Sequence, residues 1–233
     1  MRLVLVTELF YPFLYGGGER RFWEVARRLV GEFDVVVVTS GLGRRPRLEV
    51  VDGVRVRRVS RLTVRRLPER DLAGSFEFFF KVFPVVLSEK PDLVDVNTYI
   101  PVLPSFLASV AAGAPIVATI HDVYESWAGV FQSRVQAVLG KVTELYTTRL
   151  PYAAVVVPSS GVKEKVVKHG ADPRRVYVIP NGIDLQLIDS VEAEKREGQI
   201  AYVGRLVPHK RLQDLSLIHI SEPTRPRLIS YAV

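Results

Sequence analysis

Three consecutive glycines, Gly16, Gly17 and Gly18, follow the aromatic stretch FYPFLY and precede residues that favour a helix. Glycines at the start of a helix let backbone N–H groups approach a phosphate, and the helix dipole favours negative charge there. Consecutive glycines are also typical of a tight turn that needs positive φ. The sequence therefore predicts either a phosphate-binding loop or a turn, and both interpretations stay open at this point.

The glycines do not complete a known nucleotide-binding pattern. Gly16 and Gly18 match the first two positions of the dinucleotide pattern G-x-G-x-x-G, but Arg21 occupies the third. The next apolar run ends in Thr39 and Ser40 rather than in the acidic residue that binds a ribose. The pattern G-x-x-x-x-G-K-[ST] is also absent from the sequence. A nicotinamide enzyme and a P-loop nucleoside triphosphatase are both disfavoured.

Polar residues follow three other apolar runs, in positions where they could line a pocket. His121 and Asp122 follow "ATI", Asn97 and Tyr99 follow "LVDV", and Asn181 follows "VIP". Ligands of open parallel sheets bind beyond the carboxyl ends of the strands, so we expect these residues near a ligand. His121 is the candidate active-site histidine, although a lone histidine after a strand is often structural. For Asn97 and Tyr99, the only evidence for a role in the pocket is their position just after a strand.

The sequence shows no pattern of metal ligands. It contains no D-x-D triplet, and the spacing of its four histidines does not suggest a metal site (His121, His169, His209 and His219). The absence of cysteine excludes a disulfide framework and a zinc–thiolate site, and it suits a reducing compartment. We expect no metal and no cofactor, and a cytoplasmic protein.

Hydrophobic periodicity predicts alternating strands and helices. Short β-branched runs at 3–7 and 34–39 flank an amphipathic helical pattern, and two short strands surround Asp52 and Gly53. A stripe of phenylalanines at helical spacing follows, formed by Phe76, Phe79, Phe80 and Phe83. Further helices are expected near 102–112 and 131–149, and further strands at 92–97, 116–120, 153–158 and 175–180. The order indicates a doubly wound α/β domain with a parallel sheet.

Two short polar residues are expected to start helices. Ser159 or Ser160 could cap the helix after the strand at 153–158, and Asp184 could cap the segment after Asn181. Asn181 and Gly182 would then form the turn at a domain junction. For Asn181, a structural role and a role near a ligand both remain open.

The positive charge is concentrated in one window. The segment from Arg44 to Arg70 contains ten arginines and three acidic residues, which accounts for the whole net charge of +7. A solvated face, anionic lipid headgroups or nucleic acid could each explain it. Nucleic acid is disfavoured because aromatic residues do not interleave with the arginines. The apolar runs at 1–10 and 76–87 are too short and too polar to cross a bilayer.

Five stretches in one order resemble glycosyltransferase family 4, whose members are retaining enzymes of the GT-B architecture. The stretches are "FYPFLYGGGER", "KPDLVDVN", "HDVY", "IPNGID" and "VGRLVPHK", and the resemblance runs from residue 1 to about residue 215. The resemblance implies a Rossmann-like acceptor domain, then a nucleotide-sugar donor domain, with a saccharide or lipid-linked acceptor. It places Gly204, Arg205 and Lys210 at the donor diphosphate and His121 near the donor sugar. It requires neither an enzymatic nucleophile nor a metal.

The sequence departs from the family pattern after residue 215. We expect an acceptor domain at 1–186, a linker at 187–198, the start of a donor domain at 199–215 and a non-native tail at 216–233. The tail contains Pro223 and Pro226, which cannot continue the helix that "HKRLQDL" begins. The E-x-x-x-x-x-x-x-E motif that the family carries further along its donor domain does not occur after "VGRLVPHK". We therefore expect an incomplete second domain and little or no activity from this chain.

Two alternatives to a glycosyltransferase remain at this point. One is a GT-B-like epimerase or phosphorylase, and the other is a non-catalytic basic module that binds glycans or lipid surfaces. For the lipid surface, we expect any peripheral membrane contact to involve the Arg44–Arg70 window.

Overall fold

The computed structural model describes residues 1–14, 16–41, 47–61, 64–66, 69–97, 99–124 and 134–192, together with Tyr202 and Asp214. The chain divides into a compact unit, Met1–Gly182, and a second unit from Ile183 onward. The described part of the second unit contains one helix, α6 (Leu185–Asp189). Asp184 caps it by accepting a hydrogen bond from the Leu187 backbone N–H at 3.1 Å, as the sequence predicts.

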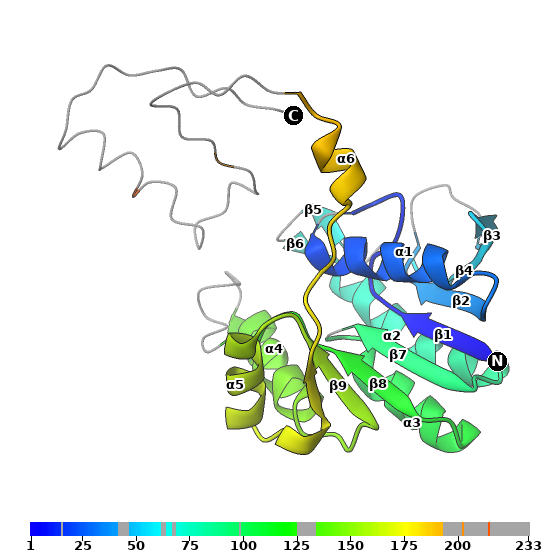
Figure 1. Cartoon of the computed structure of the whole chain (residues 1–233). Helices are drawn as coiled ribbons and strands as arrows, with labels where there is room; N and C mark the ends of the chain where they lie inside the picture. The colour runs from blue at the N-terminus through cyan, green and yellow to red at the C-terminus, as the bar shows by residue number, and fades with distance from the viewer. Residues whose placement is uncertain are drawn as a thin grey trace. The chain divides into compact units, whose positions relative to one another are not determined.

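The compact unit is built on an eight-stranded sheet in the order β10-β9-β8-β7-β1-β2-β4-β3 (Figure 1). All neighbouring strands are parallel except β3, which pairs with β4 in antiparallel orientation. The strands are β1 (Arg2–Val6), β2 (Asp34–Thr39), β3 (Leu48–Val51), β4 (Val54–Arg58), β7 (Leu93–Asn97), β8 (Ile116–Thr119), β9 (Ala154–Val157) and β10 (Val176–Val178). A separate antiparallel pair is formed by β5 (Val64–Arg66) and β6 (Glu69–Arg70).

Among the described residues of the compact unit, the α-helices that connect these strands are α1 (Gly17–Leu29), α2 (Leu72–Ser88), α3 (Val102–Ala112), α4 (Arg134–Thr147) and α5 (Ser160–Lys168). Ser159 is the N-cap of α5 and accepts a hydrogen bond from the Val162 N–H, so the predicted cap is confirmed. Asp52 and Gly53 have φ angles of 48° and 80°, which the hairpin between β3 and β4 requires. No described helix combines the length and apolar character needed to cross a bilayer.

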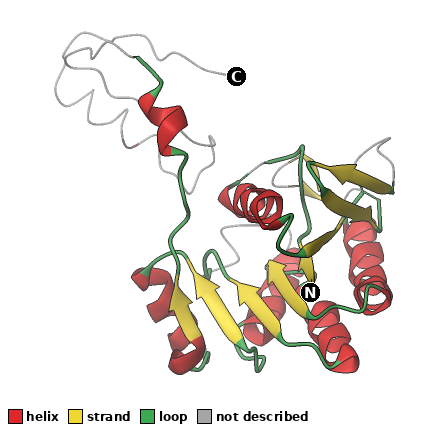
Figure 2. Ribbon diagram, turned by 45° about the vertical axis from the view of Figure 1, so that its right-hand side comes forward, coloured by secondary structure: helices red, strands yellow, loops and turns green. Residues whose placement is uncertain are grey.

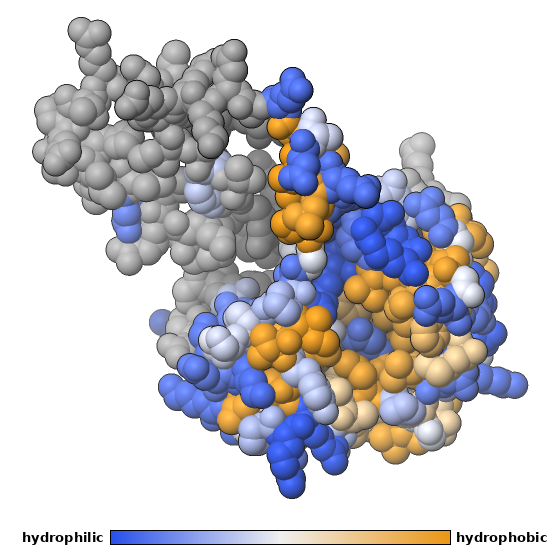
Figure 3. All heavy atoms as spheres, viewed as in Figure 1, coloured by the Kyte–Doolittle hydropathy of each residue, from blue (hydrophilic) through white to orange (hydrophobic). Residues whose placement is uncertain are grey.

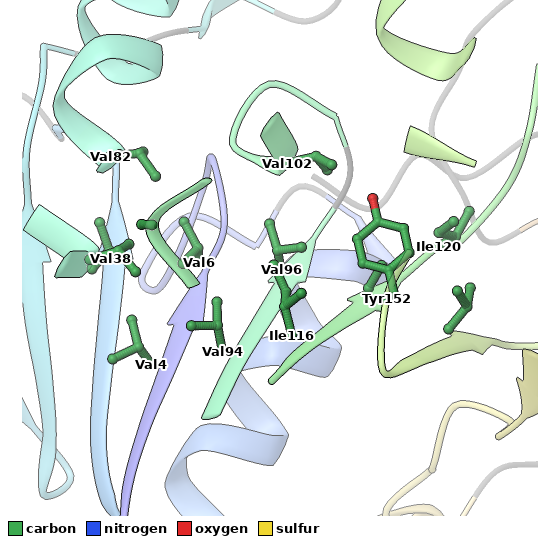
Figure 4. Packing of buried hydrophobic residues seen from close by; sticks show 14 of the residues in the cluster. Val4, Val6, Val38, Val82, Val94, Val96, Val102, Ile116, Ile120 and Tyr152 are labelled. Atoms are coloured by element: carbon green, nitrogen blue, oxygen red, sulfur yellow. The ribbon is translucent and has the colours of Figure 1, made fainter. Parts of the chain in front are cut away.

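Two hydrophobic cores lie on opposite faces of the sheet. Val4 and Val6 of β1 face the larger core, to which α2, α3 and α5 contribute buried residues. Leu3 and Leu5 of the same strand face the smaller core under α1. Figure 2 shows α1 on one side of the strands, opposite α2 and α3, and Figure 4 shows Val82 and Val102 pointing from the helices toward the sheet.

The core under α1 covers only part of its face of the sheet. Among the described residues, it takes side chains from β1, β2 and β4 and from Leu93 of β7, but from none of β8, β9 and β10. Figure 3 shows hydrophilic residues over α1 and apolar residues at the surface over β7 and β8. The ends of β7 and β8 therefore lie on a face that α1 leaves open, and the polar groups described below lie at this edge.

The predicted phenylalanine stripe lies on the helix α2, but it is not the buried face of this helix. The buried residues of this helix are Gly74, Phe78, Val82 and Val86, whereas Phe76 and Phe80 are 56% and 70% exposed. Phe78, Val82 and Val86 recur every four residues, and they reach the β-branched residues of the larger core. Because nearly the whole helix is apolar, its sequence contains two candidate faces, and contact with the sheet selects one.

Truncation of Phe78 and of Phe80 should have very different effects on stability. Phe78→Ala removes a fully buried ring and should lower the free energy of unfolding by about 3–5 kcal/mol. Phe80→Ala, the matched control at an exposed position, should change it by less than about 0.5 kcal/mol. Urea unfolding of both variants measures the difference. Similar losses for the two would contradict the observed orientation of α2.

Candidate functional site

The strand order brings the connections that follow β1 and β7 to neighbouring positions at the carboxyl ends of the strands. From β1 the chain proceeds outward to β2 and β4 and then returns to β7 on the other side of β1. The connections after β1 and β7 therefore run in opposite directions, which makes the carboxyl ends of these strands a topological switch point, the place where ligands of open α/β sheets bind. Gly18, Asn97 and His121 come from the segments that follow or end β1, β7 and β8.

Gly18 lies against two of the predicted site residues. A Cβ on Gly18 would be 3.1 Å from His121 Cδ2 and 3.2 Å from Asn97 Nδ2. These separations are shorter than ordinary van der Waals contacts, so a side chain at this position would have to displace His121 or Asn97 by a few tenths of an ångström. Positive φ is not the reason, because Gly18 is helical and Gly16 is extended, with φ of −153°. The interpretation of these glycines as a positive-φ turn is therefore wrong.

The N-terminus of α1 has an acidic residue in its first turn. Gly16 is the N-cap and supplies no side-chain acceptor. A Cβ on Gly16 would lie 3.1 Å from Glu19 Oε2, so this carboxylate is close to the helix start. The helix dipole favours such a negative charge. A phosphate bound at the glycines would lie next to the negative carboxylate of Glu19. A sugar hydroxyl at the same place could donate a hydrogen bond to that carboxylate.

His121 is held as a neutral imidazole. Burial, and next the positive charge of Arg21, lower its pKa to about 4. His121 Nε2 is buried and has no hydrogen-bond partner among the described residues. An uncharged ring with an unpaired nitrogen at this edge can donate to, or accept from, a ligand hydroxyl.

Asp95 and Asn97 lie on the same face of β7. Asn97 Nδ2 donates to Thr7 Oγ1 at 3.2 Å, which links the ends of β1 and β7. Asp95 Oδ1 accepts from Thr119 Oγ1 at 2.9 Å, and burial raises the pKa of Asp95 to about 6. The polar Asp95 within an otherwise apolar run was visible in the sequence, but its partner on β8 was not.

The pKa shifts of His121 and Asp95 have opposite effects on stability. The lowered pKa of His121 means that folding stability is lost as the pH falls from 6.5 toward 4. The raised pKa of Asp95 means that stability is lost as the pH rises from 3.8 through about 6. Between pH 4 and 6 the two contributions therefore partly offset each other.

Arg21 joins the start of α1 to the segment after β10. Its Nη1 donates to the Ile179 carbonyl oxygen and to Asn181 Oδ1, both at 3.0 Å. A Cβ on Gly17 would lie 3.9 Å from Asn181 Nδ2, so Asn181 also lies close to the glycines. In the sequence, Arg21 is notable only because it breaks the dinucleotide pattern. Its partners are almost 160 residues away and could not be read from local sequence.

Three side chains hold the segment that contains His121 and Asp122. Tyr99 Oη donates to the Asp122 carbonyl oxygen at 2.7 Å. Lys165 Nζ lies 3.0 Å from Asp122 Oδ1, which also accepts from the Val123 N–H. The buried Glu144 accepts from the Tyr124 N–H at 3.2 Å. The sequence analysis singled out Tyr99 and Asp122 but missed Glu144 and Lys165.

The structure thus gathers the predicted residues of the compact unit at one edge of the sheet (Gly16, Gly17, Gly18, Asn97, Tyr99, His121, Asp122 and Asn181). The predicted donor residues Gly204, Arg205 and Lys210 lie outside the described residues. Within the described part of the chain, no group of three or more His, Cys, Asp or Glu side chains could hold a metal ion.

Comparisons with known proteins identify the family. A family model for Glycosyltransferase Family 4 matches residues 15–187, which is most of the chain. The chain belongs to Glycosyltransferase Family 4. No curated protein matches it.

Solved structures share the fold at low sequence identity. HepE from Anabaena, solved in complex with UDP and glucose, superposes with a TM-score of 0.54 at 18% identity, over 80% of this chain and 46% of HepE. Sucrose-phosphate synthase from Thermosynechococcus elongatus gives 0.58 at 14% identity, over 80% of this chain and 49% of the synthase. A glycosyltransferase from Rickettsia africae superposes with a TM-score of 0.50 at 17% identity, over 81% of this chain and 45% of that protein. The chain thus spans about half the length of these GT-B proteins, and its fold is the Rossmann-like α/β fold of one half.

Alanine at Gly18 should disturb the site more than alanine at Gly17. Alanine has the higher helix propensity, which favours both variants. In Gly18→Ala, however, the new methyl group must displace His121 or Asn97, whereas in Gly17→Ala it makes an ordinary contact. We expect Gly18→Ala to be less stable than Gly17→Ala by about 1 kcal/mol, with larger NMR shift changes at His121. Equal stability and equal NMR shift changes for the two variants would show that Gly18 lies farther from His121 and Asn97 than the structure indicates.

The imidazole of His121 should titrate near pH 4. Proton NMR of the ring across pH 3–8 measures this value. Removal of a nearby positive charge should raise the pKa, so Arg21→Gln should move the titration upward. Arg20→Gln is the matched control, because Arg20 pairs with Glu24 and is not among the causes of the shift. A normal pKa near 6.5 in the unchanged chain would contradict the burial of His121.

Proposed function

We propose that the protein to which this chain belongs transfers a sugar from a nucleotide-sugar donor to a saccharide or lipid-linked acceptor, with retention of anomeric configuration. Membership of Glycosyltransferase Family 4 supports the reaction class. HepE, which shares the fold, was solved with UDP and glucose, and this supports a nucleotide-sugar as donor. The single observation in the structure that carries the proposal is the convergence of Gly18, Asn97 and His121 at the switch point of the sheet.

The proposed roles follow from the chemistry of each group. Neutral His121 would hydrogen-bond a sugar hydroxyl near the reacting centre, because its Nε2 lacks a protein partner among the described residues. The carboxylate of Glu19, at the start of α1, is better suited to accept a hydrogen bond from an acceptor hydroxyl than to share its place with a phosphate. We therefore assign the glycine loop to the acceptor side of the cleft. A loop that binds donor phosphate is the second possibility.

The donor site is proposed to lie in the second domain. Breaking the bond between sugar and diphosphate places negative charge on the leaving oxygen, which fixed cations stabilise. Arg205 can bind two phosphate oxygens at once, Lys210 supplies a point charge, and Gly204 allows close backbone approach. We propose that these groups make a metal unnecessary. We further propose that turnover needs the second domain in complete form.

Substitution of Arg205 should impair transfer in a version of the protein that carries the complete second domain. Arg205→Ala should lower turnover by on the order of a hundredfold, because it removes a charge that stabilises the leaving group. Arg174→Ala is the control, since Arg174 is exposed and pairs only locally with Asp172. Release of nucleoside diphosphate in the presence of acceptor measures the rate. A loss below about threefold would show that the role of Arg205 is different.

The same assay, read by NMR, distinguishes the proposed reaction from the alternative one. A glycosyltransferase forms product only when acceptor is present, and retention gives a product anomer equal to that of the donor. Conversion of the nucleotide-sugar to its epimer without acceptor would instead support a GT-B-like epimerase.

Addition of a chelator should leave the rate of transfer unchanged.

A further inference from the structure

The strand β3 (Leu48–Val51) forms one edge of the eight-stranded sheet, and among the described residues no strand pairs with its outer side (Figure 1). In its antiparallel pairing with β4, the Arg58 N–H donates to the Arg47 carbonyl oxygen at 2.8 Å. Residues that exchange such bonds alternate along a strand with residues that do not. The backbone N–H and C=O groups of Leu48 and Val50 therefore point away from β4, toward the open edge.

The side chains of the same two residues are exposed and apolar. Leu48 and Val50 are 67% and 68% exposed. They line a groove of about 650 Å³ together with Arg55, Arg57 and Glu89. Both arginines form ion pairs with the Glu89 carboxylate, so the part of the groove nearest the edge is apolar. A strand added at this edge would therefore place its own apolar side chains against Leu48 and Val50.

The two edges of the sheet differ in their protection. At β10, the other edge, Lys163 Nζ donates to the Val176 carbonyl oxygen at 2.9 Å, and Pro180 follows the strand. Lysine and proline at a sheet edge are common means of preventing association between edges. Within Leu48–Val51, β3 contains neither residue. The edge at β3 is thus suited to pairing with another strand.

Opposite charges flank β3. Arg47 precedes the strand, Asp52 follows it in the turn to β4, and both residues are exposed. If two copies of β3 pair in antiparallel orientation, each Arg47 lies beside the Asp52 of the other copy, and the same attraction forms twice. A parallel pair would instead bring like charges together. The charge pattern of β3 is therefore complementary to itself in antiparallel orientation.

One register of two antiparallel β3 strands satisfies the outward-facing groups. With the two Glu49 residues opposite each other on a two-fold axis, each Leu48 lies opposite Val50 of the second copy, and each such pair exchanges two backbone hydrogen bonds. Like charges directly opposite would be unfavourable. Glu49 Oε1, however, lies 2.5 Å from Nη2 of the buried Arg58 in its own chain, which compensates its charge.

We propose that β3 pairs in antiparallel orientation with β3 of a second copy of this chain, so that the two eight-stranded sheets become one continuous sheet. A two-fold contact of this kind uses the same surface on both copies, as most homodimers do. The charges and the outward-facing residues of β3 complement each other, which favours a second copy over an unrelated extended peptide. The pairing goes beyond the proposed function and does not depend on it, because β2 and β4 separate β3 from the candidate site at β1, β7 and β8.

Sedimentation equilibrium of the 233-residue chain, without nucleotide-sugar or acceptor, tests the association separately from sugar transfer. Because the paired strands are short, we expect a weak dimer with a Kd on the order of 10–100 μM. Amide hydrogen exchange then locates the contact. The N–H groups of Leu48 and Val50 should exchange at least about fivefold more slowly in the dimer than in the dilute monomer. The Val178 N–H, at the β10 edge, is the control and should not change.

A lysine at the centre of the contact should weaken the dimer. Val50→Lys should raise the Kd by at least about tenfold, because it places two charges at the paired edges. Val110→Lys is the matched control, since Val110 is 64% exposed on α3, and it should change the Kd by less than about twofold. Thermal unfolding should show that both variants remain folded.

An exchange of charges distinguishes self-pairing from other uses of the edge. Arg47→Glu should raise the Kd by on the order of fivefold, because it places a carboxylate beside Asp52 of the second copy. Arg47→Glu combined with Asp52→Lys should restore the Kd to within about twofold of the unchanged chain. Lysine suits this turn, because Asp52 has a φ of 48° and Lys90 adopts 51° in the same chain. An unrelated peptide at this edge would not produce this recovery.

Three results would overturn the proposal. The first is a chain that remains monomeric at concentrations about tenfold above the expected Kd. The second is an equal Kd for Val50→Lys and Val110→Lys. The third is a dimer in which the exchange of the Leu48 and Val50 amides is unchanged, which would place the contact on another surface, such as the exposed Phe76 and Phe80 of α2.

Discussion

The placement of β1 between β2 and β7 is the constraint on which the candidate site depends. Parallel pairing on both sides of β1 forces the chain to leave the sheet in opposite directions at this point. The start of α1 then lies so close to the ends of β7 and β8 that a Cβ at Gly18 would force the side chain of His121 or Asn97 to shift. Asn97 and His121 come together because the backbone approaches them there, and without that strand order they would be unrelated loop residues.

Two buried groups at this edge, His121 and Asp95, favour the neutral state. Burial lowers the pKa of His121 and raises that of Asp95, so the partly enclosed edge disfavours charge of either sign. Arg21 is an exception that the fold uses structurally, because it bonds the segment at Ile179 and Asn181. The result suits recognition of uncharged sugar hydroxyls on this side. It leaves the compensation of diphosphate charge to the cations proposed for the second domain.

Charge on the remainder of the surface is divided between two environments. In β4, arginines meet acidic residues from distant parts of the chain, so a strongly basic stretch of sequence becomes a set of ion pairs. The pair of Arg55 and Asp34, in which both side chains are exposed, contributes little stability by itself. Near α2, the only acidic side chain of the helix is held by two cations, and positive charge remains beside exposed phenylalanines. Net charge alone could not distinguish these two situations.

The sequence by itself determined the order and type of the strands of the main sheet and of the helices α1 to α5, but not the short pair of β5 and β6. The strand at 34–39 and the helix at 102–112 have the predicted bounds, and Ser159 and Asp184 act as caps, because periodicity and capping are local properties. The sequence also placed His121, Asn97 and Gly18 at the carboxyl ends of strands. Their mutual contacts follow only from the strand order.

Tertiary structure decided which of two apolar faces of α2 is buried, since both satisfy the helical period and only the β-branched sheet surface distinguishes them. It also decided the partners of Arg21, Glu144 and the arginines of β4. These contacts join residues from 9 to 160 positions apart. No local pattern specifies such pairs, because they form only when the sheet has brought their elements together.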